Sequence, residues 1–368
     1  MSRDNKINQF QSALPSPGEL KSAIPLSTET SEFIEFSRKK IEGILTNKEQ
    51  SLILIVGPCS IHDPTAALEY ASKLKVLAKE VSENFTILMR VYFAKPRTTL
   101  GWKGFMYDPT LDGSNEILTG ITRTRQLLAD LAKQNIMTAA EFLDPMTVPY
   151  FEDLITWGCI GSRTSESQTH RVMASGLPMP IAFKNNTDGN IKIAVEGVLV
   201  ASTPHTFISI NEEGRLAPIS TQGNPNCHVV LRGGKLRTNY DPQSISETLN
   251  QLRSYNLNEK VIIDCSHGNC LKDFKQQTAV FESIINQVIE GNSNISGLIL
   301  ESNLVSGTQS IESDTLSSLQ YGQSITDSCI DWTTTENLIR WGHERLTKHN
   351  NEQNSLNLET HAQNLVPN

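Results

Sequence analysis

The chain has 368 residues, of which 38% are hydrophobic and 20% are charged, and its net charge at pH 7 is -8. This is the composition of a soluble protein that can bury a large core, and its acidic balance gives no sign of a nucleic-acid-binding surface. No stretch approaches the roughly 18 apolar residues that a membrane helix needs, and the polar segment 1–9 is unlike a secretory signal. We therefore expect a cytoplasmic protein that acts on small molecules, without nucleic acid or a membrane as partner.

The six cysteines, at positions 59, 159, 227, 265, 270 and 329, form no CxxC pair. Their even number leaves disulfide pairing open, but a reduced cytoplasm favours free thiols. A free cysteine is then available either as a small buried side chain or as a metal ligand.

The first 45 residues look like a separate N-terminal extension. Pro15, Pro17 and Pro25 interrupt its first part, and apolar residues at helical spacing predict a helix over residues 31–45. We favour a helix that caps the floor of the domain that follows, and the alternative is a regulatory or oligomerisation arm.

Residues 46–349 repeat one pattern, in which a short apolar run is followed by polar residues and, in several places, by a helical segment. The eight apolar runs are residues 52–56, 86–91, 136–142, 159–163, 180–184, 228–232, 261–264 and 297–301. Helical patterns cover residues 64–81, 117–134, 148–157, 244–257 and 274–290. Alternating β and α units predict a parallel sheet, and this many favour a closed (β/α)8 barrel, although an open doubly wound sheet has the same periodicity.

Two segments depart from this pattern. Between residues 184 and 228 there is no single clear helix–strand unit, and two short strands, 205–211 and 215–220, flank the turn at 212–214. They predict a β-hairpin inserted at about 205–220. Residues 350–368 are rich in Asn, Gln and Glu, which predicts a flexible C-terminal tail.

The active site of a (β/α)8 barrel lies at the carboxyl ends of its strands, so the residues that follow each apolar run are candidates for function. Several runs are followed by basic residues: Arg90, Lys95, Arg97, Arg163, Lys184 and Arg232. One such residue alone is more often a solvated charge or part of a salt bridge, but together they would bring many positive charges to one cleft. Convergent Arg and Lys suit phosphate and carboxylate groups, so we expect anionic substrates.

A second group has the chemistry of a metal site: Cys59, His267, Glu301 and Asp327. Its sulfur, nitrogen and oxygen donors suit Mn, Fe, Co or Zn better than Mg. Each residue alone has an ordinary explanation as a buried or hydrogen-bonded side chain, and the spacing carries no local metal signature. The competing histidines are His62, His170, His205 and His228.

Together these residues resemble the type I 3-deoxy-D-arabino-heptulosonate 7-phosphate (DAHP) synthases, the microbial, feedback-regulated form. The resemblance covers residues 57–64, 89–104, 163–171, 183–189, 231–235, 264–269, 301–303 and 321–327. It implies a (β/α)8 barrel with an N-terminal extension and an inserted hairpin. It also implies a transferase that joins phosphoenolpyruvate to erythrose 4-phosphate, the first step of the shikimate pathway, with one divalent metal ion per subunit.

The resemblance further implies roles for single residues. Cys59, His267, Glu301 and Asp327 match the metal ligands, and Lys95, Cys59 and His267 match the catalytic groups, with Lys95 as a general acid. The residues that match the phosphoenolpyruvate site are Arg90, Lys95, Glu141, Arg163, Lys184 and Arg232. Pro96, Arg97 and Thr98 match the erythrose 4-phosphate site.

Members of this family are usually dimers or tetramers and are inhibited by phenylalanine, tyrosine or tryptophan. Pro178 stands where relatives carry a serine in a segment linked to inhibitor binding. Ser209 resembles the phenylalanine-sensing relatives, whereas residues 221–225 resemble the tyrosine-sensing ones, so the effector stays open. Two rival functions are a related synthase that uses arabinose 5-phosphate and a non-catalytic barrel that only senses aromatic amino acids.

Overall fold

The computed structural model describes residues 13–311 and 318–363, so residues 1–12 of the predicted extension and 364–368 of the predicted tail lie outside the described part. Eight parallel strands close into a barrel in the order β1-β10-β9-β8-β5-β4-β3-β2. They are β1 (Leu52–Gly57), β2 (Phe85–Arg90), β3 (Thr138–Glu141), β4 (Trp157–Ile160), β5 (Ile181–Lys184), β8 (His228–Leu231), β9 (Val261–Asp264) and β10 (Ile295–Glu301). The predicted (β/α)8 barrel is confirmed and the open sheet is wrong, because β1 pairs with both β2 and β10.

The barrel strands are buried along their whole length, which explains why they appear in the sequence as continuous apolar runs. Each of the eight predicted runs coincides with one barrel strand. The prediction was least accurate at β4, which begins at Trp157 and ends at Ile160. Arg163 therefore lies in the loop that follows the strand.

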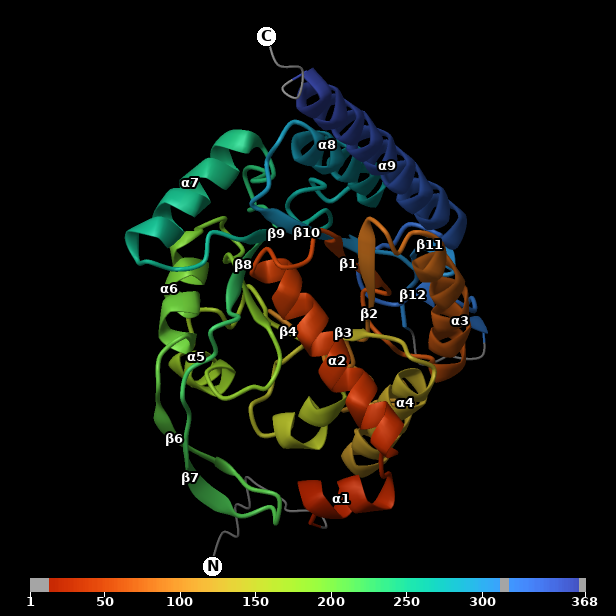
Figure 1. The fold of residues 1–368 in the computed structure, drawn as a ribbon. Coiled ribbons are helices and arrows are strands. Elements are labelled where there is room, and N and C mark those ends of the chain that lie inside the picture. Colours follow the sequence, from red (N-terminus) through yellow and green to blue (C-terminus); the bar gives the residue numbers. More distant parts are fainter. Residues whose placement is uncertain (1–12, 312–317, 364–368) are drawn as a thin grey trace, which may run out of the picture.

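Helices surround the barrel on the outside (Figure 1). They are α3 (Pro64–Glu80), α4 (Ile117–Lys133), α5 (Gln168–Ala174), α6 (Lys192–Ala201), α7 (Pro242–Ser254), α8 (Gln277–Ile289), preceded by the 3-10 turn η3 (Phe274–Gln276), and α9 (Trp332–Gln363). Asp63 and Asp241 cap α3 and α7, and a proline follows each cap at the first helical position. Of the helices that the sequence did not predict, α5 is too short to show a period, and α6 is apolar almost throughout and has no clear polar face.

The helix predicted at residues 148–157 is wrong. Two short 3-10 turns, η1 (Val148–Tyr150) and η2 (Glu152–Leu154), occupy this segment. Only Ile155 and Thr156 separate η2 from β4, which already begins at Trp157. Too little chain is left for an α-helix.

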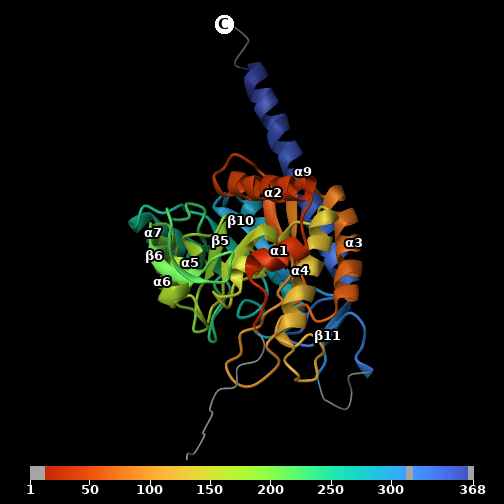
Figure 2. The ribbon, with the colours of Figure 1, turned by 90° about the horizontal axis from the view of Figure 1, so that it is seen from below.

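The N-terminal extension contributes α1 (Pro17–Ala23) and α2 (Thr28–Leu45), and α2 crosses one mouth of the barrel (Figure 1). Ile41, Ile44 and Leu45 of α2 pack against apolar side chains inside the barrel, such as Ile53 and Ile299. This is the position expected of a capping helix. Figure 2 shows α2 at one end of the molecule and the long loops at the other end, where the carboxyl ends of the strands lie.

The predicted insertion is an antiparallel hairpin of β6 (Thr206–Ile210) and β7 (Leu216–Ser220). Its turn lies against α1, because the Gly18 N–H donates to Glu212 O at 2.9 Å and Lys21 Nζ lies 2.6 Å from Glu212 Oε1. A second small sheet pairs β11 (Val305–Thr308) with β12 (Gln323–Ser324). The hairpin thus contacts the extension through its turn, and the chain reaches Asp327 directly after the second sheet.

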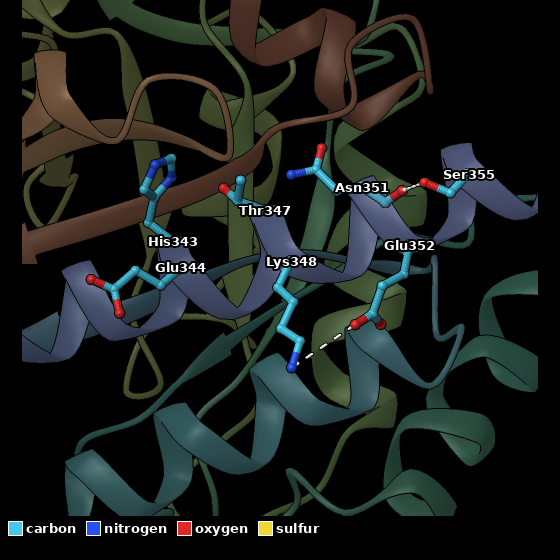
Figure 3. A pocket seen from close by; sticks show the side chains of 7 residues that line it. All are labelled: His343, Glu344, Thr347, Lys348, Asn351, Glu352 and Ser355. Atoms are coloured by element: carbon cyan, nitrogen blue, oxygen red, sulfur yellow. Dashed lines mark hydrogen bonds and ion pairs between the residues drawn. The ribbon is translucent and has the colours of Figure 1, made fainter.

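The last helix, α9, continues to Gln363 and projects from the body of the molecule (Figure 2), so residues 350–363 are helical rather than an irregular tail. Its Glu, Gln and Leu residues are good helix formers, and Lys348 pairs with Glu352 one turn on. A shallow groove on α9 is lined by seven residues, among them His343, Thr347 and Lys348 (Figure 3). Asn84 just before β2 bonds to His343 and Thr347, so this groove lies at the opposite end of the barrel from the predicted site.

The six cysteines are all buried and free in the described chain, as expected. None of the described helices combines the length and the apolar character that a membrane span needs.

Candidate active site

Three of the four predicted metal ligands meet at the carboxyl end of the barrel. Cys59 follows β1, Glu301 ends the neighbouring strand β10, and Asp327 follows β12. One ligand atom from each of the three lies within 4.8 Å of the others. His267 stands beside them, with its Nε2 atom 3.7 Å from Glu301 Oε1. A thiol, an imidazole and two carboxylates fit a first-row transition metal.

The ring of His267 is oriented for this position by its neighbours. His267 has a φ of 56°, an uncommon backbone conformation for a side chain of this size. Its Nδ1 atom lies 3.0 Å from Asp264 Oδ2 and 2.7 Å from Ser266 Oγ. A carboxylate only accepts hydrogen bonds, so we assign the hydrogen to Nδ1, which leaves the Nε2 lone pair free for a metal.

The competing histidines lie outside this cluster. His170 and His205 bond to the backbone carbonyls of Leu143 and Val200, and the Trp157 indole donates to His228 at 3.0 Å. Neither His62 nor His267 is in the group of clustered ligand atoms among the described residues, but His267 lies beside it through its contact with Glu301.

Lys95 lies directly beside the cluster. Its Nζ atom donates to the carbonyl oxygen and to the Sγ atom of Cys59, each at 3.1 Å. Burial and, to a smaller extent, the charge of Glu301 raise the pKa of the Cys59 thiol to about 12, although Lys95 opposes the shift. Without a metal the thiol therefore keeps its proton at neutral pH, and metal binding would displace that proton.

Three of the predicted phosphoenolpyruvate cations surround one aromatic ring. The Arg90 guanidinium lies 4.0 Å, Lys184 Nζ 5.8 Å and Lys95 Nζ 5.9 Å from the ring centroid of Tyr92. The π face of a buried ring attracts cations and helps to hold them close together. Tyr92 was not among the predicted site residues, because an aromatic residue after an apolar strand gives no signal of its own.

Two of the predicted substrate residues carry a buried polar atom that has no hydrogen-bond partner within the described chain: Arg90 Nη1 and Glu141 Oε1. Arg90 is 0% exposed, and its Nη2 atom donates to Glu301 Oε1 at 3.0 Å. Glu141 Oε1 lies so close to Gly161 that a side chain there would collide with it. A buried polar group without a partner costs roughly 1–3 kcal/mol, which is understandable where a ligand completes its bonding.

The remaining predicted substrate residues lie in the loops around this centre. Arg163 Nε donates to Thr98 Oγ1 at 2.9 Å, and this bond joins the two predicted substrate sites. Burial lowers the pKa of Arg232, Asp264 opposes this shift, and the positive charge of Arg163 lowers the pKa further. In the loop after β2, Arg97 and Thr98 are exposed and Pro96 is half-buried.

The residues proposed for the effector lie elsewhere. Pro178 is exposed in the loop between α5 and β5, and Ser209 pairs with Ala217 in the hairpin. Ser175 Oγ and Thr221 Oγ1 lie 2.6 Å apart and connect the end of α5 to the end of the hairpin. These residues therefore belong to the hairpin side of the molecule, outside the cluster of cations and metal ligands.

Comparison with known proteins gives consistent matches over most of the chain. Residues 24–340 match the DAHP synthetase I family. The chain is 46% identical to the Tyr-sensitive phospho-2-dehydro-3-deoxyheptonate aldolase of Escherichia coli (strain K12), over 91% of this chain and 94% of that protein. It is 44% identical to the Phe-sensitive enzyme of the same organism, over 92% of this chain and 95% of that one.

A solved structure gives the same result. The phospho-2-dehydro-3-deoxyheptonate aldolase from Francisella tularensis SCHU S4 superimposes with a TM-score of 0.89 at 44% identity, covering 92% of this chain and 98% of that chain. The chain belongs to the DAHP synthetase I family.

Proposed function

We propose that this chain catalyses the condensation of phosphoenolpyruvate with D-erythrose 4-phosphate and water to DAHP and phosphate. The observation that carries the proposal is the set of buried cations around Tyr92, with Arg90 Nη1 unpartnered in the described chain, beside the cluster of Cys59, Glu301 and Asp327. Such a site fits an anionic substrate next to a metal-activated carbonyl. Its family membership gives the identity of the two substrates.

Phosphoenolpyruvate is held by Arg90, Lys95, Lys184, Arg163 and Arg232, with Glu141 at its edge. Arg97 and Thr98 bind the phosphate of erythrose 4-phosphate, and Pro96 belongs to the same substrate-binding loop. The hydrogen bond from Arg163 to Thr98 keeps the two anions side by side, which lowers the entropic part of the barrier. The surrounding positive charge also stabilises charge that develops as the carbon–carbon bond forms.

Cys59, His267, Glu301 and Asp327 would hold the metal ion, and these donors favour Mn, Fe, Co or Zn. When bound, the metal supplies Lewis acidity toward the aldehyde oxygen of erythrose 4-phosphate. Lys95 stands 3.1 Å from Cys59 Sγ and donates a proton, or a hydrogen bond, to the oxygen that becomes the new alkoxide. Water then adds at the second carbon of phosphoenolpyruvate, and phosphate leaves by cleavage of the C–O bond.

We assign catalysis to residues 46–349, and regulation and assembly to the extension 1–45 with the hairpin. The support is the contact of α1 with the hairpin turn through Gly18, Lys21 and Glu212. An aromatic amino acid inhibits the enzyme from this side, with Pro178 and Ser209 in its site. We also propose a cytoplasmic homodimer or homotetramer.

Turnover of phosphoenolpyruvate with erythrose 4-phosphate, measured by phosphate release and by product mass, tests the proposal. We expect activity that EDTA abolishes and Mn²⁺ restores, and inhibition by at least one of phenylalanine, tyrosine and tryptophan. A parallel assay with arabinose 5-phosphate is the control for the sugar. Turnover with that sugar alone, or aromatic amino-acid binding without any turnover, would overturn the proposed function.

A further inference from the structure

Asp264 lies between the proposed metal site and the proposed phosphoenolpyruvate site. It is the last residue of β9, and its side chain is completely buried. One oxygen, Oδ2, lies 3.0 Å from Lys184 Nζ and 3.0 Å from His267 Nδ1. Lys184 is a proposed phosphoenolpyruvate residue and His267 a proposed metal ligand, so a single carboxylate oxygen is shared by the two sites.

The other oxygen is held in place by Ser266. The Ser266 backbone N–H and hydroxyl donate to Asp264 Oδ1 at 3.0 Å and 2.6 Å. The carboxylate therefore cannot turn to serve its two Oδ2 partners with separate oxygens.

Two donors that share one oxygen compete for it. A cation bound at His267 Nε2 withdraws electron density from the ring and makes the Nδ1–H a stronger donor. Asp264 Oδ2 is then drawn toward His267, and its hold on the Lys184 ammonium weakens. The freed ammonium group is the one that faces the anionic substrate beside Tyr92.

We propose that Asp264 is a positioning residue that couples metal binding to phosphoenolpyruvate binding through its shared contacts with His267 and Lys184. The inference rests on the proposed function, because it takes the two ligands from there. The coupling is reciprocal: the metal tightens phosphoenolpyruvate binding, and phosphoenolpyruvate tightens metal binding by the same factor.

The test measures binding without erythrose 4-phosphate, so that no turnover occurs. Mn²⁺ affinity is determined by electron paramagnetic resonance, and the Kd of phosphoenolpyruvate by calorimetry, with EDTA and with saturating Mn²⁺. In the wild-type protein we expect Mn²⁺ to lower the Kd of phosphoenolpyruvate by about 5-fold or more. We call the Kd of phosphoenolpyruvate with EDTA divided by its Kd with Mn²⁺ the ratio. In Asp264→Asn this ratio falls below about 2-fold, since the shared charge is lost. The Mn²⁺ affinity of this variant falls roughly 10- to 100-fold.

A matched control separates coupling from general damage. Asp153→Asn removes the charge of an ion-paired carboxylate elsewhere, on Arg125, and retains the wild-type ratio. A purely structural role for Asp264 would lower the stability of Asp264→Asn but leave the ratio at its wild-type value.

If Asp264→Asn does not fold, His267→Ala breaks the link from the other side, and at Mn²⁺ saturation phosphoenolpyruvate should bind as weakly as with EDTA. A wild-type ratio in Asp264→Asn or, in that case, in His267→Ala would overturn the inference and assign the coupling to the charge of the metal alone. Independent binding of Mn²⁺ and phosphoenolpyruvate in the wild-type protein would also overturn it, while leaving the proposed function in place. Failure of the wild-type protein to bind either ligand would instead reject the proposed function.

Discussion

The ion pair between Arg90 and Glu301 leads to a stability prediction that depends on the metal. The two side chains are 0% and 2% exposed, and Arg90 Nη2 lies 3.0 Å from Glu301 Oε1. Arg90→Met keeps a long apolar side chain over Tyr92 but leaves Glu301 without its buried cation. We expect a large loss of stability in the metal-free protein, because an uncompensated buried charge is unfavourable.

The magnitude follows from the geometry. Two unit charges 3.0 Å apart attract each other by about 5 kcal/mol at an effective dielectric constant of about 20. Breaking a buried ion pair by removing one partner typically costs about 3–5 kcal/mol, in agreement with that value. With roughly 2.1 cal/mol/K of unfolding entropy per residue, a loss of about 4 kcal/mol in a chain of 368 residues lowers Tm by about 5 °C.

A divalent cation at Cys59, Glu301 and Asp327 would place positive charge beside Glu301 again. The rise in Tm on adding Mn²⁺ should therefore be larger for Arg90→Met than for the wild-type protein. Circular-dichroism melts at one protein concentration, with EDTA and with Mn²⁺, measure both effects.

Arg123→Met is the matched control, because Arg123 is exposed with its guanidinium 5.0 Å from the Phe105 ring centroid. Its free energy of unfolding should change by no more than about 0.5 kcal/mol, with no dependence on Mn²⁺. If Arg90→Met melts like the wild-type protein in EDTA, Glu301 does not depend on this ion pair. If Mn²⁺ raises both Tm values equally, the metal does not bind at Glu301.

Four further predictions concern single side chains. Cys59→Ala should lose both bound metal, measured by plasma mass spectrometry, and turnover; metal-dependent turnover in this variant would reject Cys59 as a ligand. Arg163→Ala should raise the KM for phosphoenolpyruvate roughly 10- to 100-fold in steady-state assays, as expected from loss of a charge-assisted hydrogen bond. Its effect on kcat should be smaller. An unchanged KM would show that Arg163 does not bind phosphoenolpyruvate. Burial lowers the pKa of His228 to about 4, so the unfolded chain binds a proton first as the pH falls. Thermal melts should show stability that is full above about pH 6.5 and declines by about 3 kcal/mol toward pH 4, and His228→Gln should flatten this decline; an equal slope in both proteins would contradict the assignment. The Gln277 side chain accepts a hydrogen bond from the Glu301 backbone N–H at 2.8 Å and donates one to the Glu301 carbonyl at 3.1 Å. Gln277→Leu should therefore weaken Mn²⁺ binding about 10-fold. An unchanged Mn²⁺ affinity would show that these two hydrogen bonds are not needed.

The barrel strands could be predicted because each is buried on both faces, and such strands appear in the sequence as short continuous apolar runs. Their ends were less certain, as at β4, where the predicted run began two residues after Trp157 and continued three residues past Ile160 to Arg163. Helix α6 was missed for the opposite reason, since it is apolar almost throughout and lacks the polar stripe that marks a surface helix. Closure into a barrel is a property of strand pairing, and the pairing of β1 with β10 joins segments that no local pattern connects.

In the site, too, features encoded by neighbouring residues could be predicted, whereas contacts between residues distant in sequence could not. Residues such as Arg163 and Lys184 were predicted because a strand end is visible in the sequence and a charge placed there is unusual. Asp264 and Gln277 act only through partners that folding supplies, at separations of 80 residues to Lys184 and 24 residues to Glu301. Neither shows this role in the sequence: Asp264 ends a strand as Lys184 does, and Gln277 begins a helix. Groups that touch ligands can therefore be inferred from position and chemistry, whereas the groups that hold them become visible only when the distances are known.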